Sequence, residues 1–203
     1  MNVAPIVFVI DDDPAVGRAI KAGISRLMSV AVRTFASAEE FLEAYDAEQP
    51  GCLVLDIKMP GMSGIELQEK MQSLGISLPV IMISAHARVA TAVQALKDGA
   101  LTLLEKPFVI EQLQEEIKVA IDRDAQARKA ADEQLAIEAR LATLTPRERE
   151  VMEQIRIGSS SKEIAALLGT SVPTVDKHRW KVLEKMQVEN AVELVCVLHK
   201  IVE

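Results

Sequence analysis

The chain has 203 residues, a net charge of -7 and a hydrophobic fraction of 49%. These values are typical of a soluble globular protein, with room for one domain of about 120 residues and a second of about 60. No apolar run approaches the roughly 18 to 20 residues that cross a bilayer, and the first apolar stretch, residues 6–10, is too short for the core of a signal peptide. We therefore expect a cytoplasmic protein with no membrane partner.

The first 121 residues alternate short apolar strings with amphipathic segments. Strands are predicted at residues 6–10, 31–35, 52–55, 80–84 and 101–104. Helices are predicted to begin near Pro14, Ser37, Ser63, Val89 and Ile110. Apolar runs without alternation indicate strands buried on both faces, so this rhythm predicts an α/β fold with a five-stranded parallel, doubly wound sheet. In such a sheet a ligand site forms beyond the carboxyl ends of the strands.

Polar residues follow several of these strands. They are Asp11 and Asp12 after the first strand, Asp56 at the end of the third, and Ser84 and Lys106 after the fourth and fifth. A parallel sheet brings strand ends to one edge, and a carboxylate cluster there is costly without a cation such as Mg²⁺. Strand-end aspartates are also common helix caps, which is our interpretation of Asp13 before Pro14. Capping does not account for acids on different strands together with Lys106.

Four segments are similar to the successive motifs of two-component receiver domains. They are residues 7–13 (VFVIDDD), 55–64 (LDIKMPGMSG), 80–86 (VIMISAH) and 98–108 (DGALTLLEKPF). The resemblance covers residues 1–121 and implies a phosphoacceptor domain. Its phosphoryl donor would be a sensor histidine kinase.

The resemblance assigns a role to each residue of the acidic cluster. It implies that Asp56 accepts the phosphoryl group and that Mg²⁺ is bound by Asp11, Asp12, Asp56 and the carbonyl of Ile57. It also implies that Ser84 and Lys106 contact the phosphoryl oxygens, that Lys58 and His86 tune the phosphoryl lifetime, and that Pro107 follows a cis peptide bond. Enzymatic activity would be limited to Mg²⁺-dependent self-phosphorylation and self-dephosphorylation at Asp56.

Two residues depart from the pattern of the family. Leu103 stands where many relatives carry Phe or Tyr, so the usual movement of an aromatic ring cannot be assumed. Ser84 replaces a commoner Thr but keeps the hydroxyl group.

Residues 110–143 are predicted to form one long helix. The segment has no Gly and is rich in residues of high helix propensity. Ile110, Leu113, Ile117 and Ile121 form an apolar stripe that thins out further along. We interpret residues 122–143 as a helical linker, with a flexible linker as the alternative because few apolar positions support its middle.

Residues 144–203 are predicted to be all-helical, with helices at 146–157, 161–168, 172–186 and 191–202. Thr145 with Glu148 and Ser160 with Glu163 have the spacing of capping boxes. Gly169 and Thr170 separate a short helix from a longer one whose polar side includes Thr174, Lys177, His178, Lys181 and Lys185. This arrangement indicates a helix-turn-helix, although a basic helix face is also a common solvated surface.

Residues 144–150 (LTPRERE) and 159–186 (SSSKEIAALLGTSVPTVDKHRWKVLEKM) resemble the DNA-binding domain of FixJ/NarL-type, or LuxR-type, regulators. The resemblance implies that Lys162, Thr174, Lys177, His178 and Lys181 face double-stranded promoter DNA, with Lys177 reading a base. Trp180 has two interpretations: contact with a thymine methyl or sugar, or packing against the linker or a partner subunit.

The sequence as a whole predicts a response regulator in which phosphorylation of Asp56 promotes homodimerisation and DNA binding, and activates transcription with RNA polymerase as a partner. A Mg²⁺-dependent aspartyl-phosphate phosphatase is disfavoured because Lys58 stands where such enzymes place a second acid. A regulator that ignores phosphate remains open because of Leu103. Cys52 and Cys196 lie in apolar strings and are expected to be free, buried thiols.

Overall fold

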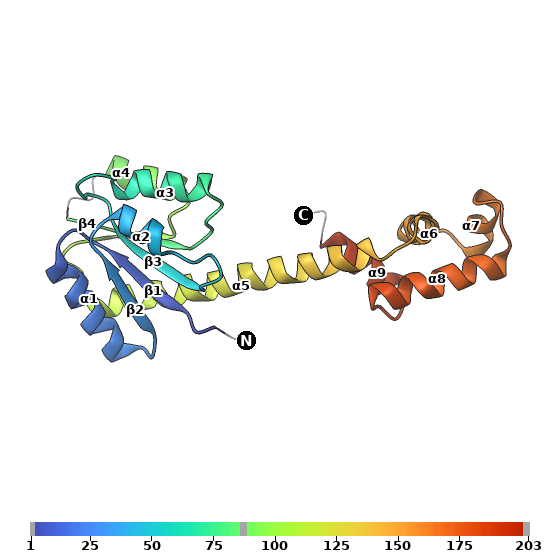
Figure 1. Ribbon diagram of the computed structural model, residues 1–203, viewed down its shortest axis with the longest axis horizontal. Coiled ribbons are helices and arrows are strands. Elements are labelled where there is room, and N and C mark those ends of the chain that lie inside the picture. Colours follow the sequence, from blue (N-terminus) through green and yellow to red (C-terminus); the bar gives the residue numbers. More distant parts are fainter. Residues whose placement is uncertain (1–2, 86–88, 201–203) are drawn as a thin grey trace. The chain divides into compact units, whose positions relative to one another are not determined.

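The computed structural model describes residues 3–85 and 89–200, with the backbone alone over 89–92. The chain divides between Arg128 and Lys129 into two compact units, which are called here the first and the second unit (Figure 1). Lys106 and Pro107 are joined by a cis peptide bond, as the resemblance implies. Within the described ranges no helix is both long enough and apolar enough to cross a bilayer.

The first unit is built on one parallel sheet. Its strands are β1 (Ile6–Ile10), β2 (Ala31–Phe35), β3 (Gly51–Asp56), β4 (Val80–Ser84) and β5 (Thr102–Glu105). They lie in the order β2-β1-β3-β4-β5, and every neighbouring pair is parallel. The helices are α1 (Pro14–Leu27), α2 (Ala38–Ala44), α3 (Gly64–Ser73), α4 (Val89–Lys97) and the start of α5 (Ile110–Ala142). The prediction of a doubly wound α/β sheet is confirmed.

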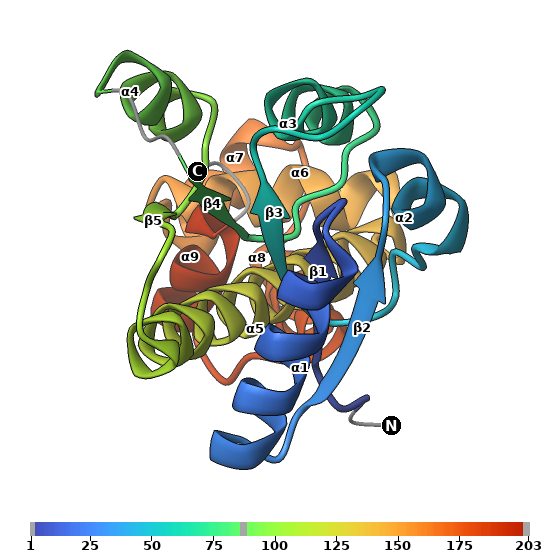
Figure 2. The same cartoon turned by 90° about the vertical axis from the view of Figure 1, so that its left-hand side faces the viewer.

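Alternate residues of the strands point into two separate cores. Phe8 and Ile10 pack on the side of α2 and α3, whereas Val7 and Val9 pack on the side of α1 and α5. Figure 2 shows α2, α3 and α4 on one side of the sheet and α1 and α5 on the other. Because helices cover both faces, the inner strands β1, β3 and β4 are apolar and buried along almost their whole length, whereas the edge strand β2 carries exposed Arg33 and Thr34.

The start of α3 lies directly against the end of β3. A Cβ atom at Gly64 would sit 2.3 Å from the carbonyl oxygen of Asp56, so any larger residue would push the two elements apart. Ser63 caps the helix, and its backbone N–H and hydroxyl both donate to Glu66 in a capping box. Gly64 therefore allows the β3–α3 loop to close tightly around Asp56.

The second unit is helical. It contains the end of α5, then α6 (Pro146–Arg156), α7 (Ser161–Leu167), α8 (Val172–Met186) and α9 (Ala191–His199). Its core includes Ile137 of α5, Val151 of α6, Ile164 of α7, Val182 of α8 and Leu194 of α9. The α5 helix is helical from Ile110 to Ala142, which is what the composition of the linker favours.

Short-range signals in the second unit behave as the sequence predicts. Thr145 and Ser160 form capping boxes at the starts of α6 and α7. Gly169 adopts a left-handed conformation with φ of 60° between α7 and α8, and Ser171 caps α8. The turn of a helix-turn-helix therefore forms at Gly169, because a glycine adopts the left-handed backbone conformation without strain.

The prediction for the cysteines is correct for Cys52 and wrong for Cys196. Both thiols are free, Cys52 is buried in β3, and Cys196 is exposed on α9. Leu194 and Leu198 are the buried residues of α9, and Cys196 lies two positions from each of them. Two positions correspond to about 200° around a helix, which places Cys196 on the outer side.

Candidate functional site

Three carboxylates meet at the carboxyl edge of the sheet in the first unit. Oxygen atoms of Asp11, Asp12 and Asp56 all lie within 4.8 Å of one another. Asp11 and Asp12 follow β1 and Asp56 ends β3, and these two strands are neighbours in the sheet. Asp11 and Asp56 are buried, with 3% and 8% exposure, while Asp12 is exposed.

Lys106 joins two of these acids from the end of β5. Its Nζ lies 2.6 Å from Oδ2 of Asp11 and 2.8 Å from Oδ2 of Asp56. Burial by itself lowers the pKa of Lys106, but the hydrogen bonds to Asp11 and Asp56 and the charges of these acids raise it above its usual value. Burial also raises the pKa of Asp11, against the hydrogen bonds from Lys106 and from the Asp13 N–H. The lysine is therefore held charged between the two acids.

Backbone groups hold the remaining carboxylate oxygens in place. The N–H of Asp13 donates to Oδ1 of Asp11 at 3.0 Å, and the N–H of Lys58 donates to Oδ1 of Asp56 at 3.3 Å. Asp13 itself caps α1 through the Ala15 N–H, which confirms its interpretation as a helix cap. The two buried carboxylates are thus oriented before any ligand arrives.

The other predicted residues of this site lie at the same edge. Ser84 ends β4 and is buried, and its carbonyl accepts the Lys106 N–H at 2.8 Å. The carbonyl of Ile57 accepts the Gly64 N–H at 3.0 Å and keeps a second lone pair. Lys58 is exposed beside Asp56, whereas His86 lies outside the described residues.

The donor set fits a magnesium ion. Asp11, Asp12 and Asp56 supply hard carboxylate oxygens, which Mg²⁺ prefers. Lys106 compensates one of the three negative charges, so the cluster keeps an excess of negative charge for a cation. The carbonyl of Ile57 is a further oxygen donor next to Asp56.

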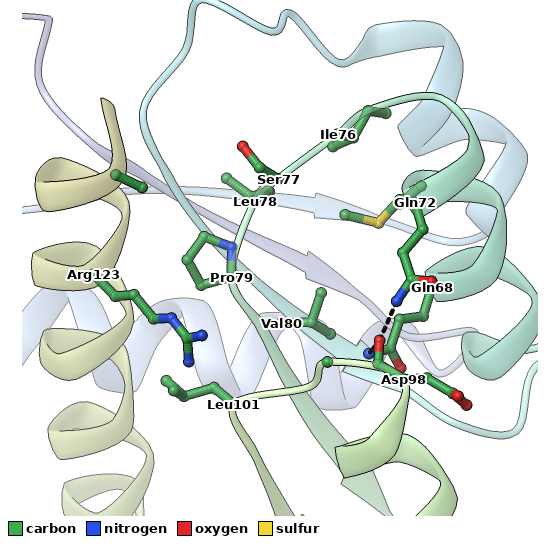
Figure 3. A pocket seen from close by; sticks show the side chains of 13 residues that line it. Gln68, Gln72, Ile76, Ser77, Leu78, Pro79, Val80, Asp98, Leu101 and Arg123 are labelled. Carbon is green, nitrogen blue, oxygen red and sulfur yellow. Dashed lines mark hydrogen bonds between the residues drawn. The ribbon is translucent and has the colours of Figure 1, made fainter. Parts of the chain in front are cut away.

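A cavity of about 190 Å³ lies elsewhere in the first unit, near the amino ends of β4 and β5. Its walls include Val80, Leu101 and Arg123, and the side-chain amides of Gln68 and Gln72 donate to the carbonyl of Asp98 beside it (Figure 3). None of the acidic cluster lines this cavity. The chemistry that the sequence predicts is therefore located at the opposite edge of the sheet.

The residues predicted to face DNA lie on α7 and α8. Lys162, Thr174 and Lys177 are exposed, while His178 and Lys181 are half-buried. Thr174 shares a hydrogen bond of 2.8 Å with Ser171 at the cap of α8. Nδ1 of His178 is buried and has no hydrogen-bond partner in the described part of the chain. Nδ1 of His178 is therefore not available to a ligand at the surface.

Comparison with known families supports the resemblance stated for each half of the sequence. Residues 7–118 match the family described as "Response regulator receiver domain". Residues 142–198 match "Bacterial regulatory proteins, luxR family". This chain belongs to the two-component response regulators with a LuxR-type DNA-binding domain.

Relatives of this response regulator match along most of their length. It is 38% identical to the transcriptional regulatory protein TdiR of Thauera aromatica, over 94% of this chain and 84% of TdiR. It is also 38% identical to the transcriptional regulatory protein FixJ of Bradyrhizobium diazoefficiens, over 93% of this chain and 92% of FixJ.

Solved structures of response regulators share the fold. The response regulator StyR is 38% identical, with a TM-score of 0.88 over 98% of this chain and 100% of the StyR chain. Full-length FixJ from B. japonicum is 36% identical, with a TM-score of 0.60 over 98% of both chains. This response regulator therefore belongs to the DNA-binding transcription regulators of two-component systems.

One basic residue of α8 has an internal role in this response regulator. Nζ of Lys185 lies 2.6 Å from Oε2 of Glu148 and 3.0 Å from the carbonyl oxygen of Thr143. The Glu148 side chain is 3% exposed, and the hydrogen bonds from Lys185 and then from the Thr145 N–H lower its pKa to about 2. Sequence reasoning recognised Glu148 only as part of a capping box, because no local pattern indicates a partner 37 residues away.

Proposed function

We propose that phosphorylation of Asp56 by a sensor histidine kinase switches this response regulator. The observation that carries the proposal is the contact of Lys106 with both Asp11 and Asp56, at 2.6 and 2.8 Å, in a cluster of three carboxylates. Such a cluster combines a nucleophilic carboxylate with a cation that neutralises incoming phosphoryl oxygens. A structural ion pair alone does not explain the third acid, Asp12.

Asp11, Asp12, Asp56 and the carbonyl of Ile57 would hold Mg²⁺. The ion would supply a Lewis acid that neutralises charge on the phosphoryl oxygens. An oxygen of Asp56 attacks phosphorus, and the bond from phosphorus to the kinase histidine nitrogen breaks as the new oxygen bond forms. Lys106 and the Ser84 hydroxyl contact the transferred oxygens. Water later attacks the same phosphorus, the bond from phosphorus to the Asp56 oxygen breaks, and inorganic phosphate leaves the regenerated carboxylate. Lys58 and His86 tune that step.

Self-phosphorylation and self-dephosphorylation are the chemistry that we assign to this protein. Residues 1–121 would form the phosphoacceptor domain, 122–143 the helical linker, and 144–203 the DNA-binding domain. Phosphorylation would add about -1.5 to -2 charges at Asp56, promote a homodimer and increase binding to promoter DNA. Activation would proceed through RNA polymerase in the cytoplasm, where the promoter lies.

DNA binding would use exposed and half-buried residues of α7 and α8. Lys162, Thr174, Lys177, His178 and Lys181 are the proposed contacts, with Lys177 reading a base edge in the major groove. The support for these contacts is the exposed position of Lys162, Thr174 and Lys177 and the match of residues 142–198 to the LuxR family.

A footprinting assay on a promoter fragment tests the switch, with and without a small phosphodonor and Mg²⁺. Wild-type protein should bind about tenfold more tightly when phosphorylated, which corresponds to a coupling free energy within the usual 1–3 kcal/mol. Asp56→Asn should bind weakly in both conditions. Glu43→Gln, which changes an exposed carboxylate on α2, is the matched control and should behave as the wild type. Equal binding by all proteins in all conditions would overturn the phosphorylation switch.

A further inference from the structure

The outward side of α8 carries an aromatic residue that the core does not use. Trp180 is 61% exposed, although it is the only tryptophan of the chain. The α8 residues that face the core of the second unit are Val175, Val182 and Met186, and Trp180 is not part of that core. Trp180 is therefore not a core residue of the second unit.

Helical spacing places Trp180 beside the proposed base-reading lysine. Lys177 lies three positions before Trp180, so these two exposed side chains share the outer face of α8. Among the described residues, Trp180 has no hydrogen bond and no contact with another ring. A large apolar surface is thus presented at the middle of the helix that would enter the major groove.

The charge of the same face limits what electrostatics can contribute. Asp176 and Glu184 lie four positions before and after Trp180 and are exposed, opposite in sign to Lys177 and Lys181. Within one turn along the face of Trp180, Lys177 is one cation against the two anions Asp176 and Glu184, so the immediate surroundings of the indole offer phosphates no net attraction. Sequence recognition by α8 must then rely on direct contacts with base edges, for which an exposed indole supplies apolar area.

We propose that Trp180 is a specificity-determining residue that contacts the 5-methyl group of a thymine in the DNA site. The major groove exposes this methyl group on thymine and on no other base, and apolar side chains recognise it. The inference rests on the proposed DNA-binding function and adds the base that α8 prefers. We assign duplex DNA as the partner because Trp180 shares the outer face of α8 with Lys177, on the second helix after the turn at Gly169.

Full-length protein, treated with phosphodonor and Mg²⁺, would first select a duplex from a random pool. Because the chain has one tryptophan, its indole emission reports on Trp180 alone. Adding the selected duplex should quench or blue-shift this emission, and a random duplex should do so less. Replacing the contacted thymine by uracil, which removes only the methyl group, should weaken wild-type binding about fourfold, the effect of burying one such group.

Variants separate this contact from general binding. Trp180→Ala should lower affinity for the selected duplex about tenfold, with a smaller loss on random duplex, and should be insensitive to the uracil substitution. Trp180→Phe should retain part of the preference. Ile157→Ala is the matched control, because Ile157 is 64% exposed but lies at the end of α6. Circular dichroism should show unchanged helix content in all variants.

The outcomes distinguish the two levels of the proposal. A wild-type protein that selects no sequence overturns both DNA recognition and the role of Trp180. If the wild type selects a duplex but the indole emission is unchanged, or if uracil weakens wild type and Trp180→Ala equally, only the role of Trp180 is overturned. The two results that overturn only the role of Trp180 would leave the proposed phosphorylation switch intact.

Discussion

At the scale of residues, the two lysines near Asp56 differ in how far they compensate its charge. Lys106 contacts both buried acids, whereas Lys58 contributes only its backbone N–H to Asp56 and keeps its ammonium group exposed. The half-buried ammonium group of Lys106 acts more strongly on nearby charges than the exposed one of Lys58, because water screens the exposed charge. Lys106 is thus suited to the bound phosphoryl group, and Lys58 to a smaller effect on the water that attacks it.

Lys58→Ala should slow dephosphorylation of Asp56 about fivefold, the effect of removing roughly 1 kcal/mol of stabilisation by an exposed cation. Intact-protein mass spectrometry at successive times after removal of the phosphodonor would measure the loss of the phosphoryl group. Lys70→Ala, which removes another exposed lysine from α3, is the control and should leave the rate unchanged. An unaltered rate in Lys58→Ala would remove this residue from the tuning role.

At the scale of elements, a partly buried ion pair between Asp124 and Arg128 ties α5 to the sheet of the first unit. Oδ2 of Asp124 accepts the Gly51 N–H and the Arg128 Nε, both at 2.9 Å. The guanidinium of Arg128 also donates to the carbonyls of Ala47 and Gln49, at 3.0 and 2.9 Å. This network holds the α2–β3 loop, β3 and α5 together where the first unit ends.

Asp124→Ala should destabilise the first unit by about 2 kcal/mol, because it leaves the buried Gly51 N–H and the guanidinium without this acceptor. Hydrogen exchange should show faster exchange at Gly51 and along the last turns of α5 before Lys129. Asp122→Ala removes an exposed acid from the same helix and should have little effect. Unchanged exchange at Gly51 would contradict the assigned role of Asp124.

The ion pair of Glu148 and Lys185 joins α6 to α8 in the second unit. It predicts that the stability of the fold depends on pH. The folded state lowers the pKa of Glu148 from 4.5 to about 2, so the contribution to stability is present above pH 4.5 and is lost as the pH falls towards 2. Glu148→Gln should therefore cost about 2 kcal/mol at pH 7 and almost nothing near pH 2.

Urea unfolding of the full chain at several pH values measures this difference between wild type and Glu148→Gln. Glu150→Gln is the control, since Glu150 pairs with Arg147 at the surface and such pairs contribute little. A cost of Glu148→Gln that stays constant from pH 7 to pH 2 would be inconsistent with an ionised Glu148 as its source.

At the scale of the whole molecule, the distribution of charge along the chain affects DNA binding more than the total charge of -7 does. Residues 145–203 contain nine basic and nine acidic residues, so the excess negative charge lies in the rest of the chain. An acidic first unit would oppose non-specific attraction to DNA, and the second unit would have few cations for phosphate contacts. We therefore expect modest affinity that depends on a small number of lysines.

Lys162→Gln should weaken binding to selected and random duplexes equally and reduce the salt dependence, the slope of log K against log salt, by about 0.9. Fluorescence anisotropy of labelled duplexes at several salt concentrations gives this slope. Lys200→Gln changes a lysine that pairs with Glu133 and should leave the slope unchanged. If Lys162→Gln weakened only the selected duplex, Lys162 would be reading bases instead of phosphates.

The sequence by itself determined the elements and the edge at which the acids meet. Unbroken apolar runs specify buried parallel strands, and strand direction then places Asp11, Asp56 and Lys106 together. Gly169 and Ser171 mark the turn before α8 for equally local reasons, since backbone conformation and capping depend on residues nearby.

Only the tertiary structure decided which side chains pair and which are exposed. The pairing of Lys185 with Glu148 and of Asp124 with Gly51 joins residues 37 and 73 positions apart, and no periodic pattern encodes such a distance. Cys196 is exposed although its neighbours are apolar, because packing buries only one side of α9. Trp180 is exposed in the same way, since the core of the second unit covers only the opposite side of α8.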